Sequence, residues 1–121
     1  MEQITETMLP EVISSGIPEL KQEVGKAFYK QNAAAVLQVV VNFARDMLVK
    51  RNLSRVKWCI HYVGSVHEKG DAVVKDIIEN LFVRSFNGMK RLCTPAEWQE
   101  IYSKIPENLG IIYSNQRHAF Q

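Results

Sequence analysis

The sequence predicts an all-α protein: a bundle of five or six antiparallel helices, for which stacked helical hairpins are one arrangement. Three observations support this fold class. Apolar residues recur at spacings of three and four through most of the chain. Short polar turns separate these segments, and such short connections make consecutive helices antiparallel neighbours. Residues that cap helices, such as Asn32, Asp71 and Thr94, stand where the segments begin.

The composition limits what the protein can be. The chain has 121 residues, which is enough for a single helical domain over 1–121 with its own core. Its net charge of +2 is too small to predict a polyanionic partner. The first residues lack the features of a signal peptide, and Cys59 and Cys93 stand far apart, so we expect a cytoplasmic protein. The longest apolar run, 33–41, is shorter than the roughly 20 residues of a membrane span, so no membrane association is expected.

Two short helices are expected at the N-terminus. Pro10 suits the start of the first, and the Ser-Ser-Gly sequence at 14–16 is typical of a turn that ends it. Pro18 suits the first position of the second, because its missing N–H would have no partner there. The apolar stripe of this second helix comprises Leu20, Val24, Ala27 and Phe28.

The next helix is expected to be central. Asn32 can cap it, and it continues to about Arg51 without a turn signal. It carries two adjacent apolar stripes, one with Val36, Val40, Phe43 and Met47 and the other with Leu37, Val41, Ala44 and Leu48. An apolar surface of that width contacts two neighbours, which predicts the central place.

Two further helices follow short breaks. Asn52 tolerates the left-handed conformation at a helix end, and Ser54 can cap a helix over 54–69. Gly70 and Asp71 repeat this stop and restart. The helix that Asp71 opens turns Val74, Ile77, Ile78 and Leu81 inward.

The C-terminal part begins after a break expected at Asn87-Gly88. Thr94-Pro95-Ala96-Glu97 forms a capping box with proline at the first helical position, so a helix starts there and ends before Pro106. Leu109, Ile112 and Tyr113 predict a last short helix, and residues 114–121 show no helical period.

The histidines and cysteines show no catalytic pattern. His61 and His67 are six residues apart and point in different directions on a helix, so we expect no metal and no cofactor. Cys59 suits a small core position. Cys93 precedes the helix capped by Thr94, whose N-terminus would lower the thiol pKa. An enzyme that uses Cys93 or His61 is therefore kept as an alternative.

An aromatic group on the helix over 54–69 is the main candidate for binding. Its members lie opposite the apolar face or beside it; they are Arg55, Trp58, His61, Tyr62 and Ser65. Trp, Tyr and Arg often anchor protein interfaces. Either this helix is sandwiched between two layers, which we favour, or these residues form an exposed patch that binds another protein.

Positive charges at helix ends offer a second binding candidate. They are Lys50, Arg51 and Lys57 in one region and Lys90 and Arg91 in another. Cations also stabilise the C-terminal ends of helices, which explains some of them structurally. Nucleic-acid binding would require the two regions to meet on one face.

The segment from Gly70 to Phe86, together with the preceding helix that holds Trp58, resembles small bacterial helical proteins of unknown function. The resemblance covers about half of the chain and assigns no functional residue. The leading expectation is a non-enzymatic module, an adaptor, inhibitor or immunity-type protein, that binds another protein through a helix face. A small nucleic-acid-binding regulator is the alternative from another class.

Overall fold

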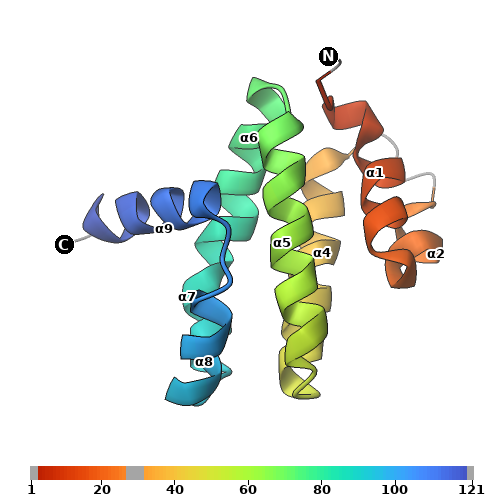
Figure 1. Ribbon diagram of the computed structural model, residues 1–121. Coiled ribbons are helices and arrows are strands. Elements are labelled where there is room, and N and C mark those ends of the chain that lie inside the picture. Colours follow the sequence, from red (N-terminus) through yellow and green to blue (C-terminus); the bar gives the residue numbers. More distant parts are fainter. Residues whose placement is uncertain (1–2, 27–31, 120–121) are drawn as a thin grey trace.

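The computed structural model describes residues 3–26 and 32–119, and over these ranges its regular elements are helical (Figure 1). The α-helices are α1 (Leu9–Gly16), α2 (Lys21–Val24), α4 (Ala33–Val49), α5 (Leu53–Lys69), α6 (Ala72–Ile77), α7 (Phe86–Arg91), α8 (Pro95–Tyr102) and α9 (Glu107–Ala119). Short 3₁₀ or π-helical turns cover Glu6–Met8, Pro18–Leu20, Ile78–Phe82 and Val83–Ser85. An isolated bridge joins Ile4 to Gly70. The all-α class predicted from the sequence is confirmed.

Helix α4 is the most extensively buried element. Its N-terminus is capped as expected, because the Asn32 side chain accepts from the Ala35 N–H at 3.1 Å. Its buried residues are Ala33, Val36, Leu37, Val40, Val41, Phe43, Ala44 and Leu48. Both predicted stripes are thus buried apart from Met47, which is half-buried. The helix packs against α1, α2, α5, α6, α7 and Ile78–Phe82, in agreement with the central place expected for it.

The remaining helices flank the pair formed by α4 and α5. Figure 1 shows α4 behind α5, with α1 and α2 on one side of the pair and α6 to α9 on the other. Two capping predictions are confirmed at the joints. Asp71 accepts from the Val74 N–H at 2.9 Å, and Thr94 and Glu97 form the reciprocal capping box. None of the helices in the described ranges is long and apolar enough to cross a membrane.

The break expected at Asn87-Gly88 is wrong, because both residues lie inside α7. The backbone stays helical from Ala72 to Arg91, through a π-helical turn at Ile78–Phe82 and a 3₁₀ turn at Val83–Ser85. The apolar face continues across these turns; its buried members are Val74, Ile78, Phe82, Val83, Phe86 and Met89. Burial along this face outweighs the local turn preference of Asn-Gly. A Cβ at Gly88 would lie 3.2 Å from the Arg45 guanidinium, so the glycine admits that side chain.

Three other boundaries differ from expectation. Residues 14–16, expected as a turn, belong to α1. The Ser14 hydroxyl donates to the Glu11 carbonyl at 3.0 Å, and the Ile17 N–H donates to the Ile13 carbonyl at the end of the helix. Asn52 caps α5 in place of Ser54. The left-handed conformation expected at Asn52 is taken by Arg51, which has a φ of 60°.

The C-terminal tail is also helical to Ala119, because contacts with distant residues hold it: Leu109 and Tyr113 are buried, and Gln116 bonds to Glu79. Of the residues expected on the stripe of the second helix, Leu20 and Val24 are buried. Ala27 and Phe28 lie outside the described residues.

The central position of α4 makes a testable prediction. Val40→Asp places a carboxylate at a fully buried site without a partner, so the variant should fail to fold. Asn42→Asp, two residues along the same helix at an exposed position, is the control and should keep the native helical circular dichroism. A cooperative thermal transition for Val40→Asp at the native temperature would contradict the placement.

Candidate functional site

Three of the five residues proposed as a binding patch fix the N-terminal segment to α5. The Trp58 Nε1–H donates to the Gly16 carbonyl at 2.8 Å, and the Tyr62 hydroxyl donates to the Val12 carbonyl at 2.6 Å. Arg55 forms a bidentate pair with Glu19, with N–O distances of 2.8 and 2.7 Å. Arg55 and Tyr62 therefore have structural roles at the contact between α5 and the segment that contains α1.

The structure combines the two arrangements considered for the aromatic residues. The Tyr62 ring lies on Gly16, where a Cβ would come within 2.0 Å of the ring, and burial raises the pKa of the Tyr62 hydroxyl. Tyr62 is thus sandwiched between α5 and α1. Trp58 remains 41% exposed although its indole nitrogen is bonded. Part of its ring, together with exposed His61 and half-buried Ser65, faces solvent.

These three residues line a groove along α5. One cavity of about 360 Å³ is lined by His61, Gly64, Ser65, Glu68, Pro106, Glu107, Asn108 and Ile111. A second of about 360 Å³ is lined by Ser54, Lys57, Trp58, His61 and Lys104. His61 lines both cavities. We call them together the α5 groove: α5 forms one wall, and residues 104–111 form the other.

The second wall of the α5 groove was not identified from the sequence. It comes from the α8–α9 connection and the first turns of α9, which are distant from α5 in the chain. Ile111 carried the one available signal, since it is apolar but falls outside the inward set of Leu109, Ile112 and Tyr113. It is 54% exposed.

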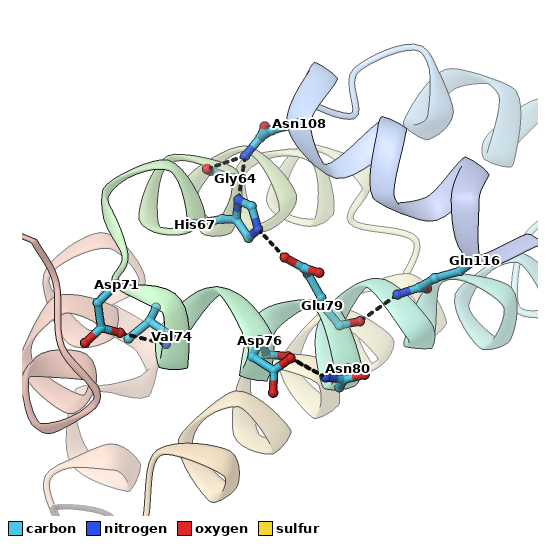
Figure 2. Close-up of polar contacts among 9 residues, drawn as sticks. All are labelled: Gly64, His67, Asp71, Val74, Asp76, Glu79, Asn80, Asn108 and Gln116. Atoms are coloured by element: carbon cyan, nitrogen blue, oxygen red, sulfur yellow. Dashed lines mark hydrogen bonds and ion pairs between the residues drawn. The ribbon is translucent and has the colours of Figure 1, made fainter.

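A hydrogen-bond network fastens this wall to α5 (Figure 2). The Asn108 amide nitrogen donates to the Gly64 carbonyl at 3.0 Å and lies 3.2 Å from His67 Nδ1. His67 Nε2 lies 3.0 Å from a Glu79 carboxylate oxygen, and Gln116 donates to the Glu79 backbone carbonyl at 2.9 Å. The network joins α5, the π-helical turn and α9.

The geometry of this network assigns the protons on His67. An amide nitrogen only donates, so His67 Nδ1 must accept from Asn108. The proton of the neutral ring is then on Nε2, from which it is donated to Glu79. The sequence placed His67 on the inner face of its helix, but its partners are 12 and 41 residues away and no local pattern reveals them.

The basic residues considered for nucleic-acid binding do come together at one end of the molecule. Arg51 donates to the Leu92 carbonyl at 2.7 Å, beside the exposed Lys90 and Arg91. Carboxylates are interspersed among them: Lys50 pairs with Asp46 at 3.0 Å, Arg51 with Glu97 at 3.1 Å and Lys57 with Glu100 at 3.6 Å. The positive potential of this end is reduced accordingly.

The thiols are poorly suited to nucleophilic chemistry. Cys59 is fully buried, as expected, and burial raises its pKa to about 12. The expectation of a lowered pKa for Cys93 is wrong, since burial and the Glu97 carboxylate raise it. The Thr94 and Glu97 side chains already accept from each other's backbone N–H groups at this helix start, so these two donors are not available to a thiolate. Within the described ranges, no group of three metal-ligating side chains is arranged to hold a metal ion.

The Asn108 bonds lead to a prediction about the stability of the groove wall. Asn108→Ala removes the side-chain donor to the Gly64 carbonyl and to the buried His67 Nδ1, and should lower the free energy of unfolding by about 1–3 kcal/mol. Asn80→Ala is the control, because Asn80 is exposed and bonds only to neighbours on its own helical segment; it should change stability by less than about 0.5 kcal/mol. Urea denaturation measures both. Equal midpoints for the two variants would mean that Asn108 does not hold the wall.

Comparison with known protein families gives a match over most of the chain. The model of a family described as a domain of unknown function, DUF7674, matches residues 10–119, most of the chain. No curated protein and no solved structure gives a significant match. The matched range contains both walls of the α5 groove and the network that joins them.

Proposed function

We propose that this chain, which belongs to the DUF7674 family, is a non-enzymatic module of the adaptor, inhibitor or immunity type that holds a segment of another protein in the α5 groove. One observation carries the proposal. Trp58, His61 and Ser65 lie in a single groove whose opposite wall is fastened in place. The proposed binding residues on α5 are therefore Trp58, His61 and Ser65. Arg55 and Tyr62 support them through contacts with the N-terminal segment.

The chemistry of the groove suits a peptide segment. Apolar surface is available on both walls, from Trp58 on α5 and from Pro106 and Ile111 opposite. Polar groups of His61 and Ser65 lie between them and can bond to a partner's backbone or side chains. An exposed tryptophan surrounded by polar residues is a common centre of binding energy.

The rigidity of the walls also favours binding. Trp58 is held by its bond to Gly16, and the start of α9 is held by Asn108. Groups that are already ordered lose little conformational entropy when a partner binds, so more of the contact energy contributes to affinity.

The other functions have weaker support. A nucleic-acid-binding regulator would use the end that holds Lys50, Arg51, Lys57, Lys90 and Arg91, and the meeting of the two basic regions there favours it. Three acidic partners among the five cations weaken it. An enzyme would use Cys93 or His61. The Cys93 thiol has a raised pKa and does not line the α5 groove. His61 does line the groove, but the nearby Ser65 hydroxyl donates to the Tyr62 carbonyl and not to His61. A cytoplasmic location is part of the proposal, and both cysteines are free thiols, as is usual there.

The proposal can be tested with protein fragments from the host genome, displayed and selected on the wild-type chain. Selected fragments should bind Ile111→Lys and His61→Ala at least tenfold more weakly in calorimetry, a loss of about 1.4 kcal/mol. Both positions are exposed, so the fold should be kept.

Val49→Lys and Val73→Lys are the matched controls, since they place the same charge on exposed apolar sites outside the groove. Fragments should bind these controls as they bind the wild-type chain. Selection of no fragment, or of fragments that bind all four variants equally, would reject the proposal.

A further inference from the structure

The charges along the α5 groove are separated by sign. Lys57 and Lys104 line the section that contains Trp58. Glu68 and Glu107 line the section that contains Ser65 and Ile111. His61 lines both sections. One end of the groove is therefore basic and the other is acidic.

Among the residues that the structure describes, most of these charges have no ionic partner of their own. The ion pairs in the described ranges do not include Lys104, Glu68 or Glu107. Lys57 pairs with Glu100 at 3.6 Å, which reduces the positive charge at its end of the groove, so Lys104 is the main cation there. All four side chains can thus interact with a bound partner.

On the α5 wall the two charges are far enough apart to act independently. Lys57 and Glu68 are on the same helix, and eleven residues at 1.5 Å each separate them by roughly 16 Å along its axis. This exceeds the screening length of about 8 Å at physiological salt. The same span corresponds to about three turns of a partner helix, or to about five residues of extended chain.

We infer that the segment bound in the α5 groove is dipolar: acidic at the end that meets Lys57 and Lys104 and basic at the end that meets Glu68 and Glu107, with apolar side chains that contact Trp58 and Ile111. This inference rests on the proposed function. A partner with charges of one sign, whether an acidic peptide, a basic peptide or a nucleic acid, would be attracted at one end and repelled at the other.

The test uses three displayed peptide libraries with the same random apolar centre. In the first library, one flank is acidic and the other is basic, and both orders along the chain are present. In the second library both flanks are acidic, and in the third both are basic. On the wild-type chain, the library with mixed flanks should be enriched at least tenfold over the other two. The enrichment should decrease as the salt concentration rises.

Two charge-reversed variants should change this preference. Glu68→Lys with Glu107→Lys makes the groove basic throughout and should select the library with acidic flanks. Lys57→Glu with Lys104→Glu makes it acidic throughout and should select the library with basic flanks. Glu6→Lys with Glu11→Lys changes the net charge as the first pair does, but outside the groove, and should keep the wild-type preference. Circular dichroism checks that each variant is folded.

The outcomes separate this inference from the function on which it rests. Suppose that peptides bind and that Ile111→Lys weakens their binding, but the charge reversals leave the library preference unchanged. The dipolar partner is then rejected, and the proposal that the α5 groove binds a partner is retained. If the libraries are enriched equally on wild type, the inference also fails. If no library is enriched on the wild-type chain, both the inference and the proposed function fail.

Discussion

Helix α5 is packed on three sides, and the architecture around it depends on this packing. Its apolar face lies on α4, with Val56, Ile60 and Val63 buried. A second side holds α1 through hydrogen bonds from Trp58 and Tyr62. A third receives α9, where Pro106 closes on Gly64 so tightly that a Cβ on the glycine would lie 2.7 Å from the proline ring. The strip that remains uncovered is the α5 groove.

Much of the fold could be predicted because its signals are local. Asn32, Asp71 and Thr94 cap the helices that they were expected to cap, since a side chain that bonds to an N–H three residues ahead needs no tertiary contact. The paired stripes of α4 were equally readable. The expected break at Asn87-Gly88 failed because burial of Phe86 and Met89 on either side keeps the helix intact. That burial depends on distant residues and is invisible to local turn preference.

The candidate site was predictable on only one wall. Trp58, His61 and Ser65 share a side of α5 by helical spacing alone, so the sequence could bring them together. The sequence could not show that Tyr62 and Arg55 instead have a structural role, because that role depends on contacts with the N-terminal segment that contains α1. The opposite wall depends on the meeting of Asn108 with Gly64 and His67, across 44 and 41 residues. The charge pattern of the groove becomes visible only after both walls are in place.

The central proposal is that a partner binds in the α5 groove. Amide NMR spectra of the chain, recorded as a selected fragment is added, test this most directly. The account predicts that the largest chemical-shift changes fall within residues 54–68 and 104–111, which come from two parts of the chain that meet only in the folded protein. Changes concentrated on α1 and α2, or around Lys50, Arg51, Lys90 and Arg91, would contradict it.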